Sequence, residues 1–505
     1  MKNMKNDQQL KPFSPDRSYL RKFIERLKKQ KNDKERKIPF IETSLLIPIL
    51  IWVILNCFLI HDFSSGISSF VGNFFIVFLL LTFFYKDLKR YKPSYIKNKK
   101  MLFLLGFLLS FTIIISRVFE HLLSVFAKGF QVDIPMLHLF GIPFSIGSVL
   151  VVIIFDFHTA ITFSLVLSLV LGLWLKNPLI SIYVFIGSLI GAFSLLRMKK
   201  RNNIINAGIF ISLVNYIVAL SILLIEGSLT LNSFYFSALF STISGVSVTA
   251  LCFILLPILE KFFNITTSVS LIELLDMDHP LLSQLATYAP GTYHHCITVS
   301  TLAEAAAEVV GVNPLFAKVA SYYHDIGKIR IPEYYVENQT GCISKHDKLS
   351  PHLSSMIIIS HVKDGVELAK EYNLPEMIND VIQQHPGTTL VTYFYQKALK
   401  ESEIPPLEQD YRYPGPKPQS KLAALIMLAD AVEAASRTLE DPTPARISNL
   451  IDKIIKNIFL DGQLDECEIT LKDLSEIKKR FEYILTGIFH RRITYPTLPK
   501  KEQIA

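Results

Sequence analysis

The chain has 505 residues, half of which are hydrophobic, and 36 of them are Phe; the mean hydropathy is +0.35. This composition excludes a purely soluble globular protein and indicates a membrane protein with room for more than one domain. The net charge of +8 is local, because residues 1–38 contain 13 Lys and Arg against 5 Asp and Glu.

We expect residues 1–38 to form a basic cytoplasmic tail, since a basic segment before a first membrane span usually sets topology or attracts anionic lipid. Nucleic-acid binding is the rival interpretation, but no aromatic or groove-reading motif accompanies the basic residues, so we expect no nucleic-acid partner. We also expect no cleavable signal peptide, because the first apolar run begins late and is long enough to span. The five cysteines form no CxxC pair, which indicates reduced thiols and a cytoplasmic soluble part.

Residues 39–260 contain nearly all the long apolar runs, and we expect them to form a helical membrane domain in a lipid bilayer. A spanning helix needs roughly 20 apolar residues, and eight segments qualify, arranged as one span followed by seven. The fourth to sixth runs are crowded, so a count of seven or nine is also compatible with the sequence. The expected spans are residues 41–60, 67–85, 101–118, 135–155, 159–175, 178–196, 204–225 and 233–258.

Loop charges test the orientation of these spans. With the N-terminus inside, the inner connections include residues 86–100, with seven Lys or Arg, and residues 197–201, with four. The outer connections carry only Arg117, Lys128 and Lys176. The positive-inside rule supports this orientation, and an even number of spans returns the C-terminal half to the cytoplasm. Ionisable residues within the spans are few, which favours an anchor or a sensor over a transporter.

From about residue 265 onward the apolar residues have helical spacing, and the predicted fold class of the whole chain is all-α. Capping residues and prolines mark where individual helices begin, and several candidate ligands are expected at or near helix ends. The predicted helices are 313–325, opened by Asn313-Pro314; 350–361, opened by Ser350-Pro351; 375–385, opened by Pro375; and 421–437, preceded by Ser420.

This helical part contains six candidate metal ligands, none of them cysteine. A neutral imidazole and a carboxylate are both good ligands for a borderline divalent cation. A single histidine at a helix end is more often a cap than a ligand, but a carboxylate on an apolar stripe is costly unless paired or metal-bound. Together the six predict a site for one or two metals and hydrolysis by metal-activated water. They are His295, His324, Asp325, His361, His385 and Asp430.

The adjacent His294 and His295 point about 100° apart on a helix, so we expect only one of them to be a ligand.

In the order and the sequence of several segments, the chain resembles the bacterial seven-transmembrane HD phosphohydrolases, specifically the PgpH-type cyclic di-AMP phosphodiesterases. The resemblance covers essentially all of residues 265–497, and the plan of eight spans fits it more weakly. The matching segments are HPLLSQLATYAPGTYHH (279–295), YYHDIGKIRIPEYYVENQ (322–339), IIISHVKDG (357–365), QQHPGTTL (383–390), GPKPQSK (415–421) and FLDGQLDECEITLKDL (459–474).

The resemblance implies an all-helical cytoplasmic HD domain holding two divalent transition metal ions, iron or manganese. According to this resemblance, His295 is the first ligand, and His324-Asp325 is the HD signature with a metal-bridging aspartate. Asp430 completes the coordination of the first metal. His361 and His385 would bind the second metal. The implied substrate is cyclic di-AMP, opened to linear pApA, and Lys328 could contact a phosphate oxygen, a solvent-facing lysine being the alternative. The implied location is the bacterial inner membrane, with both termini in the cytoplasm.

Two departures from the family pattern stand out. The family usually has a second histidine where this chain has Pro386, so the second metal is uncertain; water or His294 could fill the position, or activity could be reduced. The family also commonly carries a large extracytoplasmic domain between the first two spans, where this chain has about six residues.

The resulting division is a basic tail (1–38), a membrane domain (39–260), a linker (261–290), an HD phosphohydrolase domain (291–497) and a tail (498–505). The rival functions are an HD hydrolase of another nucleotide, such as a guanosine polyphosphate, a catalytically weak nucleotide-binding sensor, and a transporter. Homo-oligomerisation is left open by the sequence.

Overall fold

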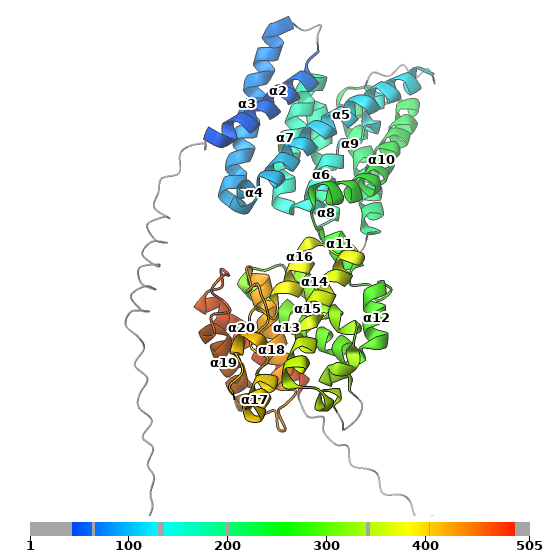
Figure 1. Ribbon diagram of the computed structural model, residues 1–505. Helices are drawn as coiled ribbons and strands as arrows, with labels where there is room; N and C mark the ends of the chain where they lie inside the picture. Colours follow the sequence, from blue (N-terminus) through cyan, green and yellow to red (C-terminus); the bar gives the residue numbers. More distant parts are fainter. Residues whose placement is uncertain are drawn as a thin grey trace, which may run out of the picture. The chain divides into compact units, whose positions relative to one another are not determined.

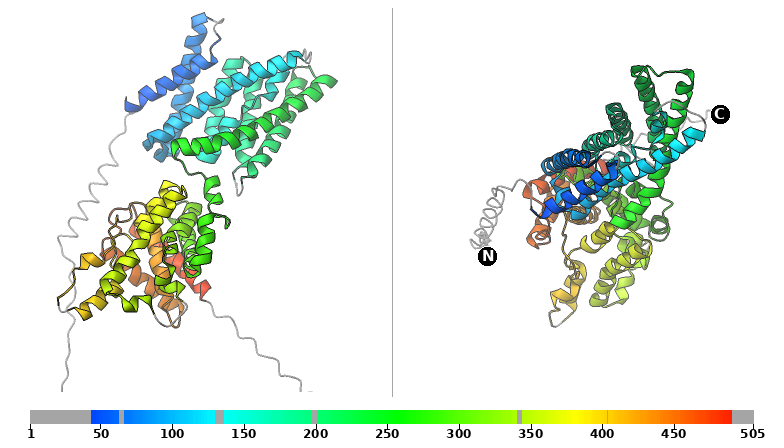
Figure 2. Two further views of the ribbon diagram at one scale, coloured as in Figure 1. Left: turned by 45° about the vertical axis from the view of Figure 1, so that its right-hand side comes forward. Right: turned by 90° about the horizontal axis from the view of Figure 1, so that it is seen from above.

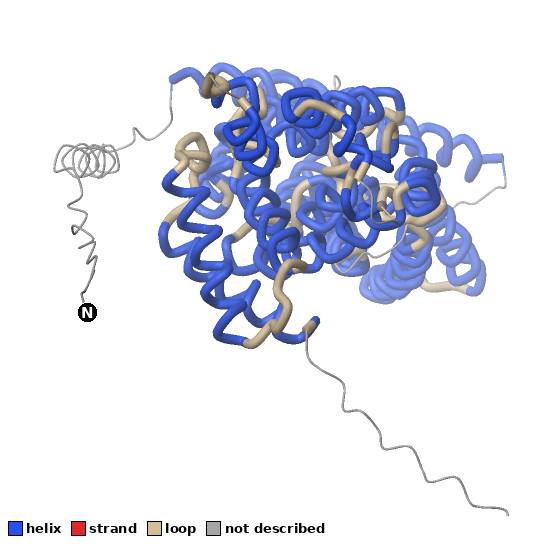
Figure 3. Tube along the Cα trace, turned by 60° about the horizontal axis from the view of Figure 1, so that its bottom comes forward, coloured by secondary structure: helices blue, strands red, loops and turns tan. Residues whose placement is uncertain are grey.

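The computed structural model describes residues 43–62, 66–129, 136–196, 201–339, 344–402 and 404–489. The predicted tails at 1–38 and 498–505, and most of the basic connection 197–201, lie outside these ranges. The described residues contain helices and loops but no strand, as the tube in Figure 3 shows, so the predicted all-α class is confirmed. The described residues form two compact units, one made of those up to 126 together with 162–185, the other of those in 127–161 and from 186 to 489.

The first unit is built from apolar helices. It contains α2 (Thr43–Ile60), α3 (Gly66–Tyr91), the short α4 (Pro93–Lys97), most of α5 (Lys99–Gly129), most of α7 (Phe157–Leu175) and the first half of α8 (Pro178–Ser194). The second unit contains the membrane helices η2 (Leu137–Gly141), α6 (Ile146–Ile154), α9 (Asn203–Ile225) and α10 (Leu231–Phe263), followed by all later helices.

Six stretches among the described residues are long and apolar enough to cross a membrane. The other two predicted spans coincide with shorter apolar helices, at Ile47–Ile60 and Pro178–Ser194. The predicted span 135–155 is not one continuous helix, because η2 and α6 are separated at residues 142–145, around Pro143. The hydroxyl of Ser244 donates a hydrogen bond of 3.0 Å to the Ile142 carbonyl there, so the broken backbone is satisfied by protein.

The helices after residue 265 form one closely packed group, coloured from green to red in Figures 1 and 2. They are α11 (Ser268–Glu273), α12 (Pro280–Tyr288), α13 (Pro290–Val310), α14 (Pro314–Tyr323), α15 (Pro351–Glu371), α16 (Glu376–Gln384), α17 (Thr392–Glu401), α18 (Lys421–Ser436), α19 (Pro444–Leu460) and α20 (Leu471–Ile488). Short 3₁₀ turns connect them, at Ile326–Ile329 (η3), Pro332–Tyr334 (η4), Val336–Asn338 (η5), Lys345–Lys348 (η6) and Glu408–Tyr411 (η7). Two of these helices, α11 and α12, fall within the predicted linker.

Helix α18 is the centre of this group. Its residues Leu422–Ala429 are all buried, and α13, α14, α16 and α19 pack around it. A helix that is apolar on all sides is stable only when surrounded in this way. The side chain of Asp430 therefore projects from a deeply buried helix at a point where neighbouring helices converge.

The predicted helix starts are confirmed at three positions. The side chains of Asn313, Ser350 and Ser420 accept hydrogen bonds from backbone N–H groups three residues later, as N-caps do. The predicted end of the second helix is wrong, because α15 does not stop near His361 but continues to Glu371. His361 thus lies in the middle of a helix, which fixes its position more firmly than a helix end would.

Candidate metal centre

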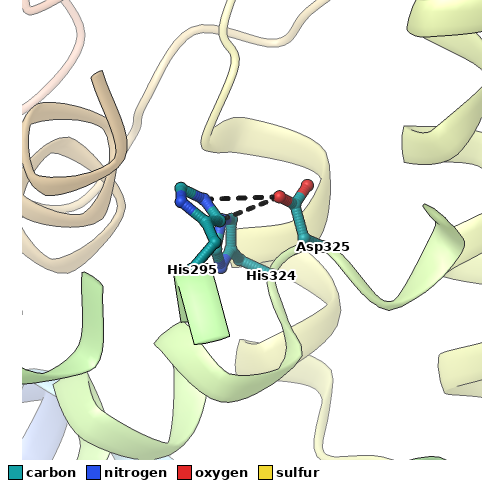
Figure 4. A group of neighbouring side chains, drawn as sticks. All are labelled: His295, His324 and Asp325. Atoms are coloured by element: carbon teal, nitrogen blue, oxygen red, sulfur yellow. Dashed lines mark ion pairs between the residues drawn. The ribbon is translucent and has the colours of Figure 1, made fainter. Parts of the chain in front are cut away.

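The six predicted ligands come together in one place. Their donor atoms form three overlapping groups within which all atoms lie no more than 4.8 Å apart. Figure 4 shows how the side chains of one of these groups point toward one another. The groups are His295, His324 and Asp325; His324, His385 and Asp430; and Asp325, His361 and His385.

The placement of these residues on the helices differs in part from the prediction. His324 and His385 are C-terminal caps of α14 and α16, as predicted. Asp430 lies inside α18, as predicted, whereas His295 and His361 lie within α13 and α15 instead of at helix ends. The site is therefore walled by three rigid helix interiors and completed by two helix ends.

Asp325 stands between two sets of imidazoles. Its Oδ2 lies 3.3 Å from Nε2 of His324 and 3.5 Å from Nε2 of His295. Its Oδ1 lies 3.4 Å from Nε2 of His361 and 3.7 Å from Nε2 of His385. One carboxylate thus presents one oxygen to each set, which is the arrangement that a ligand bridging two metal ions requires.

All four histidines direct the same nitrogen toward the centre. Nδ1 of His324, His361 and His385 donates to the backbone carbonyl three residues earlier, at 2.7, 2.6 and 3.0 Å. Nδ1 of His295 instead contacts a carboxylate oxygen of Glu433 at 2.5 Å. A hydrogen bond at Nδ1 fixes the tautomer and leaves the Nε2 lone pair for a metal.

The imidazole and carboxylate donors of the site fit a metal ion. Nε2 of His295 and of His324 is buried, and neither makes a hydrogen bond within the described structure, although carboxylates lie close by. An unsatisfied buried nitrogen is costly, and a cation held between these nitrogens and the carboxylates would remove that cost. A donor set of imidazole and carboxylate without thiolate suits iron, manganese and zinc alike.

Electrostatics differ between the two sides of Asp325. Burial opposes protonation of His324, but the adjacent Asp325 carboxylate outweighs it and raises the His324 pKa well above its usual value. On the other side, burial lowers the pKa of His361, and burial together with the charge of His324 lowers that of His385 to about 3. The imidazoles of the second set are therefore neutral at physiological pH, which is the form that binds metal.

Lys328, predicted to contact phosphate, is part of a buried ion-pair triad. Its Nζ lies 2.8 Å from Oδ2 of Asp325 and 2.9 Å from Oε1 of Glu337. Although burial favours the neutral carboxyl, Lys328 and His324 hold the pKa of Asp325 well below its usual value. Lys328 thus keeps Asp325 ionised as well as lining the hollow above it.

A glycine makes this geometry possible. A Cβ on Gly327 would lie 1.9 Å from the carbonyl oxygen of His361 and 2.5 Å from the backbone nitrogen of Gly365. The turn after Asp325 can therefore approach α15 only because residue 327 has no side chain. This close contact brings His361 within reach of Asp325.

Two carboxylates at the site were missed from the sequence. Glu433 is 2% exposed and lies one turn beyond Asp430 on the buried α18, and Glu337 closes the Lys328 triad. A signal for Glu433 was present, because an acidic residue on an all-apolar helix is costly unless paired. Glu337 sits in a short polar turn and had no comparable signal.

Position 386 contributes no donor. Pro386 is buried and lines the hollow, so the second group has three protein ligands, Asp325, His361 and His385. His294 does not fill the gap in this structure, because it is exposed and lies against Tyr293, whereas the adjacent His295 is buried.

A hollow of about 840 Å³ opens above the metal donors. Its floor includes Asp325, His361, His385 and Asp430, and its walls are rich in aromatic side chains. This volume is in the range of sites for nucleotide-sized ligands. The aromatic wall residues are Tyr334, Tyr335, Tyr393, Phe394 and Tyr413.

The helical fold, the membrane helices and the histidine-aspartate centre define a membrane protein with an HD domain. A family model described as a 7TM receptor with intracellular HD hydrolase matches residues 67–267, and an HD-domain model matches residues 292–435. The chain is thus similar, over two consecutive stretches, to the membrane region and to the HD domain of membrane-bound HD hydrolases.

Two relatives carry the name PgpH. The cyclic-di-AMP phosphodiesterase PgpH of Bacillus subtilis (strain 168) is 38% identical over 446 residues, which are 86% of this chain and 60% of that protein. The cyclic-di-AMP phosphodiesterase PgpH of Listeria monocytogenes is 43% identical over 318 residues, 63% of this chain and 44% of that protein. The chain therefore spans less than two thirds of the length of either relative.

A crystal structure of the L. monocytogenes PgpH HD domain in complex with cyclic-di-AMP is 50% identical in sequence. It covers 43% of this chain and 100% of that one, with a TM-score of 0.41.

Proposed function

We propose that this chain is a membrane-anchored, metal-dependent phosphodiesterase that opens cyclic di-AMP to linear pApA at the cytoplasmic face of a bacterial membrane. The observation that carries the proposal is Asp325, whose two oxygens face separate sets of imidazoles at the floor of a nucleotide-sized hollow. The identity of the substrate is proposed from the relatives that are cyclic-di-AMP phosphodiesterases.

The residues that would hold the first metal are His295, His324, Asp325 and Asp430, and those for the second are Asp325, His361 and His385. We propose iron or manganese, as the family resemblance implies. When bound, such ions supply an activated water and neutralise charge on the phosphate. Homo-oligomerisation stays a prediction.

The protein side chains have three tasks in this reaction. The hydrogen bonds at Nδ1 orient the four imidazoles, and Lys328 keeps Asp325 ionised. The wall tyrosines offer flat faces on which nucleobases can stack.

The orientation is part of the proposal. The connection 86–100 carries seven Lys or Arg, and the positive-inside rule places it in the cytoplasm. The N-terminus and the HD domain would then lie on the same, cytoplasmic side.

One observation favours a second function. Pro386 leaves the second metal with three protein ligands, and weak binding of that metal would produce a nucleotide-binding sensor with little turnover. Binding of cyclic di-AMP without hydrolysis would support this alternative.

The test uses the full chain in detergent, supplied with manganese or iron(II), and follows conversion of cyclic di-AMP to pApA. Hydrolysis that is lost in Asp325→Asn supports the enzyme, and faster hydrolysis in Pro386→His shows that the second site limits it. Binding without hydrolysis in the native chain, with turnover regained in Pro386→His, favours the sensor. Preferential hydrolysis of guanosine tetraphosphate would contradict the substrate assignment, and neither binding nor turnover in any folded, metal-loaded variant would contradict both functions.

A further inference from the structure

The first unit contains a polar hollow at the ends of two of its helices and beside a third. His61 and Asp62 follow the end of α2, Trp174 and Lys176 lie at the end of α7, and the second half of α5 passes beside them. The hollow measures about 660 Å³, and six of its eight lining side chains are titratable. Such a concentration of titratable groups in one concavity is unusual for a region built from apolar helices.

Three titratable side chains of α5 lie on the face that lines the hollow. Arg117, Glu120 and His121 are spaced by three and four residues, so they share one side of the helix. The neighbouring Val118 and Leu122 are 48% and 57% exposed and present an apolar surface to the surroundings. Side chains that merely anchor a helix at the membrane interface need not converge, whereas these three gather around one cavity.

Arg117 is held in place at the wall of the hollow. Its Nη2 donates to the carbonyl of His61 at 3.2 Å, and its guanidinium carbon lies 5.4 Å from the centre of the Trp174 ring. Its Nε is buried and has no hydrogen-bond partner within the described part of the chain. The guanidinium is thus pre-positioned and still has a donor to satisfy, which suits an anionic ligand.

Opposite charges line the same space. Lys176 lies 3.8 Å from Asp62, and their side chains are 63% and 54% exposed, so this pair is weak and can rearrange around a ligand. Arg117 and Lys176 balance Asp62 and Glu120, which leaves the hollow formally neutral. A lone anion or a lone cation would upset this balance, while a molecule that carries both charges would match it.

The hollow lies at the membrane side opposite to the basic connection. Helix α5 begins at Lys99, at the end of that connection, and reaches the hollow about five turns later. By the positive-inside rule, the hollow opens outside the cytoplasm.

We infer that this hollow is an extracytoplasmic binding site for a small zwitterion that carries an anionic group and a primary ammonium. Arg117 and Lys176 take the anionic group, and Asp62 and Glu120 take the ammonium. The ligand is either a free amino acid or the headgroup of phosphatidylethanolamine, which share this chemistry. The inference does not depend on the activity proposed for the HD domain.

The fluorescence of Trp174 provides a test, because the chain has only two tryptophans and Trp52→Phe leaves Trp174 alone. The full chain is placed in nanodiscs of phosphatidylcholine and phosphatidylglycerol, and each of the common amino acids is titrated separately. We expect a saturable change with at least one of them, weakened about tenfold or more in Arg117→Gln and in Glu120→Gln, as loss of a charge-assisted hydrogen bond predicts. Lys128→Gln, on α5 but outside the hollow, should bind as the parent does.

A second experiment, with a different lipid, distinguishes a free amino acid from a lipid headgroup as the ligand. If no amino acid binds, but replacing phosphatidylcholine with phosphatidylethanolamine changes Trp174 emission only when Arg117 is present, the headgroup is the ligand. Calorimetry on the chain with both tryptophans repeats the measurement without relying on Trp52→Phe. An equal response to a mixture of acetate and methylammonium would overturn the zwitterion, and so would no Arg117-dependent response to amino acids or to phosphatidylethanolamine in protein shown to be folded by circular dichroism.

Discussion

Nδ1 of His295 and Oε2 of Glu433 lie 2.5 Å apart, and this contact joins α13 to α18 directly beside the metal donors. The other oxygen of Glu433 accepts from Nε of Arg437 at 2.6 Å. Glu433 is thereby fixed from one side and orients His295 from the other, so that Nε2 of His295 faces Asp325 and Asp430. A carboxylate behind a metal-binding imidazole also increases the basicity of the ligand.

We therefore expect Glu433→Gln to weaken binding of the first metal about tenfold or more, because the imidazole loses its charged partner. The measurement is a manganese titration by calorimetry on the full chain in detergent. Glu308→Gln, an exposed substitution on the same α13, is the matched control and should leave the affinity unchanged. Equal affinities in Glu433→Gln and in the control would show that Glu433 has only a structural role.

Gly327→Ala should damage the second metal group more than the first. The added Cβ would collide with the backbone of α15 at His361 and Gly365, and relief of such overpacking typically costs about 1–3 kcal/mol. Movement of α15 displaces His361 from Asp325 but leaves His295 and His324 in place. Manganese stoichiometry should fall from two toward one, whereas Gly487→Ala, which meets nothing within 4 Å, should retain the parent value. Unchanged stoichiometry in Gly327→Ala would contradict the proposed role of this close contact.

The six donors and the all-α class could be predicted from the sequence, because capping residues mark helix starts and ligand chemistry limits which residue types can gather. Asn313, Ser350 and Ser420 identified three helix starts in this way. The end of α15 could not be predicted. A histidine such as His361 is common at helix ends, and no local sequence signal shows that the helix continues to Glu371.

Tertiary contacts also explain the other differences. At the break around Pro143, the buried carbonyl of Ile142 accepts a hydrogen bond from Ser244, a hundred residues later in the chain, as well as from the backbone of Phe144. The need for glycine at 327 depends on α15, and the partner of His295 is 138 residues away at Glu433. Contacts of such separation leave no local periodicity in the sequence.

Lys328→Met should destabilise the metal-free protein strongly, because Asp325 and Glu337 would be left buried without their shared cation. Removing one partner of a buried ion pair costs about 3–5 kcal/mol. Manganese bound to Asp325 supplies positive charge at the same place, so we expect a smaller loss of thermal stability in the metal-loaded protein. Melting temperatures with and without manganese measure this difference.

Lys318→Met, which breaks the half-exposed pair with Glu304, is the control and should change the melting temperature little in either condition. A destabilisation by Lys328→Met that is the same with and without metal would contradict the electrostatic role.

Asp473→Asn should destabilise the helical group in a pH-dependent way. Asp473 completes the capping box of α20 with Thr470 and pairs with Lys421 at 2.9 Å, and α20 packs against α13, which carries His295. Burial raises the pKa of Asp473, but the hydrogen bonds to Lys421 and Thr470 outweigh it and lower the pKa below 3.8. A carboxylate with a lowered pKa in the folded state stabilises the fold above its unfolded pKa, and this stabilisation disappears as pH falls through the folded value.

We expect Asp473→Asn to lose about 1 kcal/mol of stability at neutral pH, from the weakened cap and the lost ion pair. The difference from the parent should shrink toward zero below pH 3.8, measured by urea unfolding followed by circular dichroism. Asp452→Asn, which removes a more exposed partner of Lys478, should cost less at neutral pH. A loss in Asp473→Asn that stays constant from neutral to acid pH would mean that the carboxylate charge contributes nothing.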